Sequence, residues 1–400
     1  MDLPALLAAI ERGDDTAVFE FLDDVANDDE LTGDDGSTLL AAAAYAGRHE
    51  VVDRLVVWDV DPTRPWAGGV DPVTWAAENG AYWVLNALLS PDRDPLRADS
   101  PHRRALRVAR AALESGAGAG SVPPPAHRAV ITDLEAKLGV HRTPDELMAR
   151  ALVHADPEHD DWFVSLFRIA EPESQERFDW ARAVAEGAGE AGSLDRRRFA
   201  LDAINFLGFG FNPDNGNDEP PFDREAAEFL RPRLGTEQDP YALRAVVAAF
   251  IGYCSREELP AVLAHADHPD PGVRQCVALA FPALLTDRPD ALAVLLCLAD
   301  DPAPVIRTSA LQALTRSAVD TPDLRGVLAA HLTDPHFDAR LEAAAALALR
   351  GDERGTPVLD EIRRGIKNRS SRGAGRLDDL HYQLRARTPG HATPRPGPAM

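Results

Sequence analysis

The chain has 400 residues, 45% of them hydrophobic, and a formal net charge of −23 at pH 7. A chain this acidic repels phosphate backbones, which argues against general nucleic-acid binding. No stretch approaches the ~18 consecutive apolar residues that a membrane span requires, so we expect no membrane partner. The N-terminus has no basic region and turns acidic at once, unlike a secretory signal.

The cysteine content points to the cytoplasm. Cys254, Cys276 and Cys297 are an odd number and have no paired spacing, which argues against a disulfide framework or a zinc knuckle. We therefore expect a cytoplasmic, reduced protein. All three cysteines lie on apolar helical segments, where no neighbouring base would lower a thiol pKa. The sequence predicts that they are buried.

The N-terminal part of the chain repeats at an interval of 33 residues, because residues 36–47 (GSTLLAAAAYAG) are echoed by residues 69–80 (GVDPVTWAAENG). Gly13, Gly47 and Gly80 each lie between two apolar helical patterns, where a left-handed cap favours glycine. A fixed period of this size is typical of stacked helical repeats. The pattern resembles ankyrin repeats. That resemblance implies ankyrin repeats over residues 1–114, the last of them degenerate.

A second repeat type follows a linker. Residues 115–126 (SGAGAGSVPPPA) predict a linker that is flexible and then stiff, since glycines give way to prolines. Farther on, residues 270–281, 303–314 and 336–347 superpose without gaps as a turn and a helix. This pattern resembles HEAT repeats of the short bacterial kind first named for phycobilin lyases, which implies HEAT-like helical repeats over residues 127–365. The whole layout resembles that of ankyrin and HEAT proteins from actinobacteria. We expect an all-α protein, an α-solenoid of ankyrin repeats running into HEAT-like repeats.

The end of the chain has a different composition. Residues 362–377 carry lysine and arginine without any acid, and the last residues (TPGHATPRPGPAM) contain almost no core-forming side chains. Segments of low hydrophobicity and high charge do not bury enough apolar surface to fold. The sequence therefore predicts a basic, largely disordered tail over residues 366–400.

Arg274, Arg307 and Arg340 recur at the same 33-residue interval, each five residues after a proline. In a HEAT unit such an arginine lies near the repeat boundary, and its planar guanidinium group suits two hydrogen bonds to one carboxylate. We expect it to pair with an acid of its own turn or of the next repeat, and ligand binding is the alternative. The acids placed for pairing are Asp300, Asp301 and Asp334.

Two runs combine histidine with aspartate, residues 154–161 (HADPEHDD) and residues 265–271 (HADHPDP). Histidine beside carboxylate is a possible ligand set for a divalent metal. Both runs, however, lie between predicted helices, where aspartate and proline serve as caps and breakers. We interpret them as turns, and we expect no metal and no cofactor.

Candidate contact residues for a partner lie in two places. Tyr45, Glu78 and Asn79 occupy variable positions just before the capping glycines, and Trp66 falls in the turn between repeats, where ankyrin proteins commonly contact their targets. Aromatic residues exposed at such positions tend to dominate binding. The second place is the polar segment 208–223, which is either a binding loop or a plain connector. Its candidate contacts are Asn212, Asp214, Asn215 and Asp218.

These observations favour a non-catalytic protein-binding scaffold or adaptor, whose acidic solenoid face holds a basic protein or peptide. The alternative is an enzyme with its pocket in the solenoid groove, in the manner of HEAT-fold DNA glycosylases or phycobilin lyases. The glycosylase version conflicts with the net charge, and no catalytic residue carries over from either family. The oligomeric state stays open at this stage.

Overall fold

The computed structural model describes residues 3–24, 34–92, 94–118, 124–171, 174–187, 194–208, 222–280, 288–368 and 371–387. Regular structure in these ranges is helical, apart from one isolated β-bridge between Trp66 and Val70, so the expected all-α fold is confirmed. None of the described helices is both long enough and apolar enough to cross a membrane. The chain forms two compact units. Unit 1 comprises Met1–Gln238 and Ala248–Tyr253, and unit 2 comprises Asp239–Val247 and Cys254–Met400.

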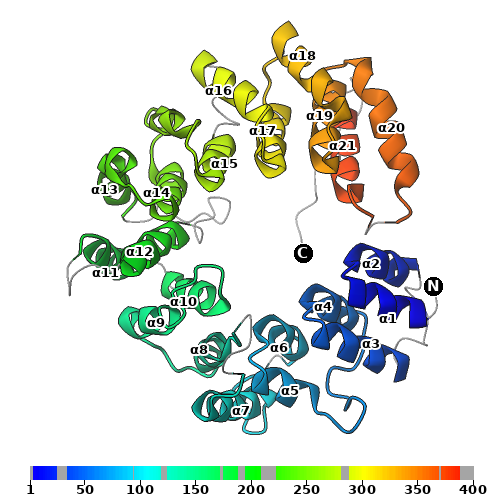
Figure 1. Cartoon of the computed structure of the whole chain (residues 1–400), viewed down its shortest axis with the longest axis vertical. Coiled ribbons are helices and arrows are strands. Elements are labelled where there is room, and N and C mark those ends of the chain that lie inside the picture. The colour runs from blue at the N-terminus through cyan, green and yellow to red at the C-terminus, as the bar shows by residue number, and fades with distance from the viewer. Residues whose placement is uncertain are drawn as a thin grey trace, which may run out of the picture. The chain divides into compact units, whose positions relative to one another are not determined.

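Unit 1 begins with successive helix pairs, blue to cyan in Figure 1. Gly13, Gly47 and Gly80 end the first helix of three pairs with φ values of 74°, 69° and 61°, which confirms the predicted left-handed caps. At Gly80 a Cβ atom would lie only 2.9 Å from the backbone nitrogen of Ala126. The pairs are α1 (Leu3–Arg12) with α2 (Asp15–Asp24), α3 (Asp34–Tyr45) with α4 (His49–Val57), α5 (Pro72–Glu78) with α6 (Tyr82–Leu89), and α7 (Pro101–Ser115) with α8 (His127–Lys137).

Helix α8 lies beyond the predicted linker, yet it packs into the same core as the helices before it. Val130 and Leu134 on α8 are buried in one cluster with Leu85 and Ala109. Helix α9 (Pro144–Ala151) begins after Thr143, which forms a reciprocal capping box with Glu146. The remaining helices of unit 1 are α10 (Asp160–Ala170), α11 (Gln175–Ala185), α12 (Leu194–Leu207) and α13 (Asp223–Thr236).

A buried ionic cluster ties α8 to its neighbours. Glu135 on α8 is almost fully buried and accepts hydrogen bonds from Arg110 of α7, Arg142, and Arg150 of α9 at 2.7 to 2.9 Å. Burial alone would raise the pKa of Glu135, but the hydrogen bonds and charges of these arginines outweigh it and hold that pKa at about 2. The carboxylate therefore stays ionised at any physiological pH.

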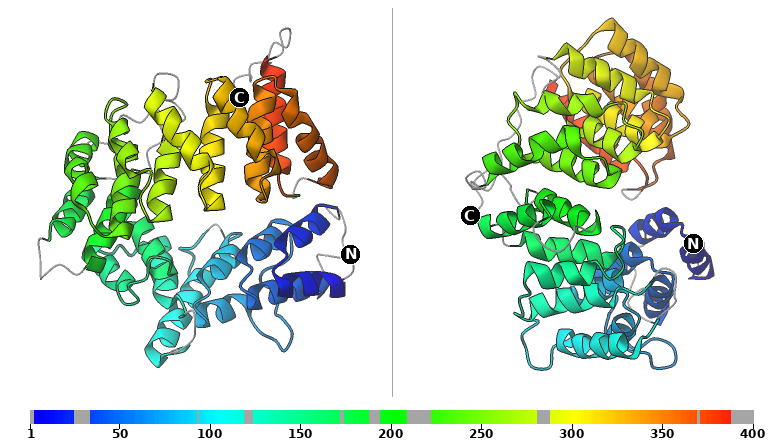
Figure 2. Two further views of the ribbon diagram at one scale, coloured as in Figure 1. Left: turned by 45° about the horizontal axis from the view of Figure 1, so that its top comes forward. Right: turned by 60° about the vertical axis from the view of Figure 1, so that its left-hand side comes forward.

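The helices of unit 2 run side by side, yellow to red in the left view of Figure 2. Helices α15 and α17 begin at Pro271 and Pro304, since the fixed φ of proline suits the first turn of a helix. Buried alanines of α17 and α19 let these neighbours approach closely. Helix α14 (Pro240–Tyr253) contributes to both units. The others are η3 (Leu259–His265), α15 (Pro271–Ala280), α16 (Pro289–Ala299), α17 (Pro304–Arg316), α18 (Pro322–Ala330), η4 (His331–Thr333), α19 (Phe337–Leu349), η5 (Glu353–Gly355), α20 (Thr356–Gly365) and α21 (Ala374–Arg387).

The repeat arginines form a ladder along unit 2. Arg274 donates Nε–H and Nη2–H to the two carboxylate oxygens of Asp301, at 2.7 and 3.0 Å. Arg307 binds Asp334 in the same way, at 2.8 and 2.9 Å. In both cases the acid belongs to the next repeat, so the pairing hypothesis is confirmed at these two arginines. Asp300 does not join the ladder, because its Oδ1 lies 3.1 Å from Nε2 of His331.

Arg340 departs from this pattern. Its Nη1 donates to the backbone oxygens of Asp334 and Pro335, as the other ladder arginines do to their own turns. Among the described residues it makes no ion pair with a carboxylate. The ladder therefore has two complete cross-links, Arg274–Asp301 and Arg307–Asp334.

In unit 1, Trp162 stands where a repeat would carry its arginine. The indole is buried on α10, and its Nε1–H donates to Oδ2 of the buried Asp202 on α12, at 3.0 Å. The ring packs edge-on against Phe199. A neutral donor thus makes a contact between neighbouring helix pairs that resembles the contact made by the ladder arginines.

Helix α21 lies in the segment that was expected to be largely disordered. Leu377 and Leu380 pack into a core with residues of α19 and α20. Arg376 donates two hydrogen bonds to the buried Glu342, at 2.7 and 3.0 Å. Arg372 and Arg376 thus pair with acids of α19, namely Asp338 and Glu342, which composition alone did not reveal. Residues 388–400 lie outside the described residues.

Candidate functional site

The predicted contact residues of the ankyrin part have different surroundings. Trp66 was expected to be an exposed contact, and this expectation is wrong: its side chain is 3% exposed, because Tyr45 and Trp75 pack against the ring at 5.2 and 5.5 Å. Tyr45 itself is exposed, as are Glu78 and Asn79 at the end of α5. The candidates of the polar loop, Asn212, Asp214, Asn215 and Asp218, lie outside the described residues.

A partly exposed row of rings on unit 1 was not predicted from the sequence. We call it the aromatic ridge, and it consists of His49, Trp83, Phe163, Phe167 and Phe206. Trp83 stacks on His49 at 5.5 Å and meets Phe163 at 5.5 Å. Phe163 in turn stacks with Phe167 at 6.3 Å and meets Phe206 edge-on at 5.9 Å. Trp83, Phe163 and Phe167 are 37%, 36% and 41% exposed.

The ridge combines side chains from α4, α6, α10 and α12, so it crosses several helix pairs of one unit. Phe163 and Phe167 are four residues apart on α10 and therefore share a helical face. In sequence this spacing is typical of a core-facing helix, so it does not by itself predict an exposed pair. Trp83 is held in place by its Nε1–H, which donates to Oδ1 of Asp160 at 2.9 Å.

Two hollows flank Trp83. The first, about 820 Å³, is lined by His49, Glu78, Asn79, Glu158 and Asp160, among others. The second, about 610 Å³, shares His49 and Trp83 with the first. Together their linings hold five carboxylates and one guanidinium group, that of Arg54, which lies 3.2 Å from Asp23. The five carboxylates belong to Glu50, Asp53, Glu78, Glu158 and Asp160.

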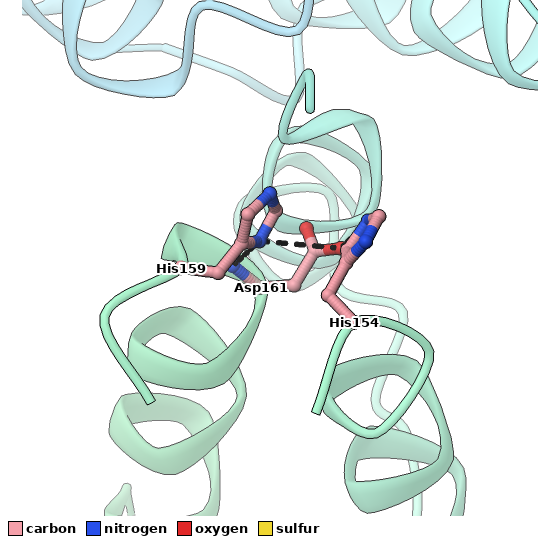
Figure 3. Close-up of side chains that lie close together, drawn as sticks. All are labelled: His154, His159 and Asp161. Carbon is pink, nitrogen blue, oxygen red and sulfur yellow. Dashed lines mark hydrogen bonds and ion pairs between the residues drawn. The ribbon is translucent and has the colours of Figure 1, made fainter. Parts of the chain in front are cut away.

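Next to the first hollow, the turn before α10 brings together His154, His159 and Asp161 (Figure 3). Their ligand atoms all lie within 4.8 Å of one another. Oδ2 of Asp161 is 3.5 Å from Nε2 of His154 and 3.7 Å from Nδ1 of His159. Burial raises the pKa of Asp161 to about 6 and lowers that of His154. The interpretation of this run as a turn is confirmed, because the side chain of His159 accepts a hydrogen bond from the Asp161 N–H and so caps α10.

The second histidine and aspartate run behaves as a turn. Nδ1 of His268 accepts from the Asp270 N–H at 3.1 Å, and Oδ1 of Asp270 accepts from the Val273 N–H at the start of α15. The prediction that all three cysteines are buried is wrong: Cys254 and Cys276 are half-buried, and Cys297 is exposed. Cys297 does not belong to the buried residues of α16, which include Leu295 and Leu298. Cys276 is largely shielded, and burial raises the pKa of its thiol to about 11.

Two segments of the chain match families of known repeats. Residues 6–99 match the family described as ankyrin repeats (3 copies), and residues 227–315 match the family of HEAT repeats. These matches confirm both repeat types. No curated protein matches the chain. The crystal structure of YibA from E. coli is distantly similar, with 16% sequence identity and a TM-score of 0.44 over 61% of this chain and 93% of that one.

Proposed function

We propose that this protein is a non-catalytic scaffold or adaptor that binds another protein, and that the aromatic ridge contacts an extended, basic segment of that partner. Ankyrin and HEAT repeats typically serve as protein-binding scaffolds. The observation that carries the proposal is the ridge itself, in which Trp83, Phe163 and Phe167 remain more than one-third exposed. Large rings left partly in water across several helices mark an interaction surface better than scattered single residues do.

The ridge consists of side chains of the kind that contribute most of the free energy of binding at protein interfaces. Covering one large apolar side chain contributes about 1.5–3 kcal/mol, and aromatic anchors dominate most interfaces. A lysine or arginine of the partner placed over Trp83 would add about 0.5–2 kcal/mol through its charge on the ring. The hollows on both sides of Trp83 give room for the partner's neighbouring side chains.

The charge around the ridge favours a basic partner. Five carboxylates line the two hollows, and the single guanidinium among them already faces Asp23. Glu78 and Asn79 line the first hollow, which supports their predicted role as contacts. Complementary charge mainly accelerates association, and salt screens it over roughly 8 Å at physiological strength. The same charge disfavours nucleic acids and anionic membranes as partners.

The test is selection of short random peptides on the full-length chain, followed by affinity measurements on the best peptide. We expect the selected peptides to be rich in arginine or lysine. Trp83→Ala and Phe163→Ala should each weaken binding by roughly tenfold or more, as expected for residues at the centre of an interface. Association of the wild-type chain should slow as salt rises, while dissociation changes less.

The matched control is Leu279→Ala, which removes a large exposed side chain from α15 in unit 2. It should leave the affinity unchanged. Peptides without positive charge, or an affinity that ignores Trp83 and Phe163, would refute the ridge as the contact surface.

A cytoplasmic location is part of this proposal. It rests on the cysteine content of the sequence, an odd number of three without paired spacing. Thiols persist in reducing compartments. Fractionation of the native host, followed by immunodetection, tests it; recovery outside the cytoplasmic fraction would contradict it.

A further inference from the structure

We propose that His154, His159 and Asp161 form a binding site for one divalent metal ion of the zinc class. The inference does not depend on the proposed partner-binding function. It rests on the positions of three ligand atoms and on a buried carboxylate oxygen that accepts no hydrogen bond.

The distances suit tetrahedral coordination. Metal–ligand bonds of roughly 2.0–2.1 Å to histidine nitrogen and carboxylate oxygen place neighbouring ligands of a tetrahedral ion about 3.3–3.4 Å apart. Oδ2 of Asp161 lies 3.5 Å from one imidazole nitrogen and 3.7 Å from the other. In Figure 3 the carboxylate of Asp161 lies between the two rings. Small movements would therefore complete three bonds to one ion.

The burial of Asp161 is a second observation that points to a bound metal ion. Its side chain is fully buried, and Oδ1 accepts from the backbone N–H of Ala129 at 2.7 Å. Oδ2 accepts no hydrogen bond, and neither does the adjacent Nε2 of His154 take part in one. Burying a carboxylate oxygen without a partner is costly. A cation bound between Oδ2 and Nε2 would compensate both atoms.

The surroundings orient the ligands as in known metal sites. Nε2 of His159 lies 3.1 Å from the backbone oxygen of Pro124, which favours a proton on Nε2 and leaves the lone pair on Nδ1. That lone pair now accepts from the Asp161 N–H, at 3.1 Å, so metal binding would exchange this capping bond for a metal bond. Oδ1 of Asp161 is fixed by Ala129, so Oδ2 keeps its direction.

Two imidazoles and one carboxylate favour zinc or a similar ion over magnesium or calcium, which prefer oxygen ligands. Three protein ligands leave a fourth position for water or for a donor from another molecule. His159 also lines the first hollow, so the site lies at the edge of that hollow.

The experiment uses Co²⁺ and Zn²⁺ alone as probes on the full-length chain. Co²⁺ should bind with one-to-one stoichiometry and give the intense visible absorption of tetrahedral coordination by nitrogen and oxygen, and Zn²⁺ should displace it. His154→Ala removes a partly exposed ligand and is expected to fold. We expect it to weaken Co²⁺ binding at least tenfold, and Asp161→Asn to do the same. His141→Ala, an exposed histidine of the same unit, should bind as the wild type does.

A thermal melt provides a second readout, since Zn²⁺ should raise the melting temperature of the wild type and of His141→Ala but not of His154→Ala. The proposal is overturned if the wild type binds no Co²⁺ at one equivalent. It is equally overturned if His154→Ala binds as tightly as the wild type, because the three residues would then be only a hydrogen-bonded turn.

Discussion

Replacing Arg307 with alanine would break one cross-link of the arginine ladder. The guanidinium donates two hydrogen bonds to Asp334 and two more, from Nη1, to the backbone oxygens of Asp301 and Pro302. Both side chains of the pair are largely buried, at 13% and 4% exposure. Removing one partner of a buried pair costs about 3–5 kcal/mol.

The cost should fall somewhat below that range, because Asp334 keeps other partners. Its Oδ1 still accepts from the His336 N–H at 2.8 Å, and His331 lies 3.3 Å from Oδ2. We therefore expect Arg307→Ala to lower the free energy of unfolding by about 2–4 kcal/mol. Asp334→Ala should cost a similar amount, and the double variant less than the sum of the two.

The ladder also predicts a pH dependence. Burial raises the pKa of Asp334, but the hydrogen bonds from Arg307 and the His336 N–H outweigh it and hold that pKa at about 2. A carboxyl pKa below its unfolded value of ~3.9 stabilises the fold above that pH, and the stabilisation is lost as the pH falls toward 2. In Arg307→Ala the pKa of Asp334 should rise, so stability should depend less on pH between about 4 and 2.

The assay is urea unfolding followed by circular dichroism, with Arg316→Ala as the control for an exposed arginine on the same helix. Tryptophan fluorescence provides an internal reference, because all of the tryptophans lie in unit 1 and Arg307 lies in unit 2. A loss below about 0.5 kcal/mol, the usual size of a surface effect, would refute the structural role of the ladder. The tryptophans are Trp58, Trp66, Trp75, Trp83, Trp162 and Trp180.

Three further predictions follow from individual contacts. Trp162→Phe removes the indole N–H that Asp202 accepts in the core of unit 1, so it should cost about 1–3 kcal/mol in urea unfolding; wild-type stability would show that the contact is dispensable. Maleimide should modify the exposed Cys297 much faster at pH 7 than Cys276, whose pKa is raised by burial to about 11; equal rates by mass spectrometry would contradict this difference. A fragment of residues 1–114 lacks α8, which completes the core around α7, so it should aggregate or unfold without cooperativity. A sharp, reversible melt of that fragment as a monomer would show that its repeats need no further helix.

Periodic features were predictable from the sequence because each repeat imposes the same local requirement. Gly47 and Gly80 cap helices where the backbone takes a left-handed conformation, and Arg274 and Arg307 each meet an aspartate of the following repeat. The sequence did not decide which aspartate pairs with which arginine, since Asp300 and Asp301 are adjacent. Only the folded chain shows that the acid comes from the next repeat.

The aromatic ridge was not predictable, because it depends on contacts between helices far apart in sequence. The histidine cluster lies within one short run whose ligand chemistry is visible in the sequence, but only the fold shows that its three ligand atoms come within 4.8 Å of one another. Phe163 follows the same spacing as a core residue, and only packing decides which face of α10 meets water. Trp66 illustrates the opposite error, since a turn residue became buried under neighbouring rings. Composition likewise suggested disorder around Arg376, although Glu342 neutralises that charge in the fold.

The two complete ladder links have a mechanical consequence. Asp334 accepts Arg307 of the preceding repeat through its carboxylate, while its backbone oxygen accepts Nη1 of Arg340 from its own repeat. Asp334 thus connects two successive repeats. Asp301 does the same, because it accepts hydrogen bonds from Arg274 and Arg307. Under a pulling force these two repeat boundaries should resist separation. Unit 2 should begin to unfold at its ends, beyond the last carboxylate of the ladder.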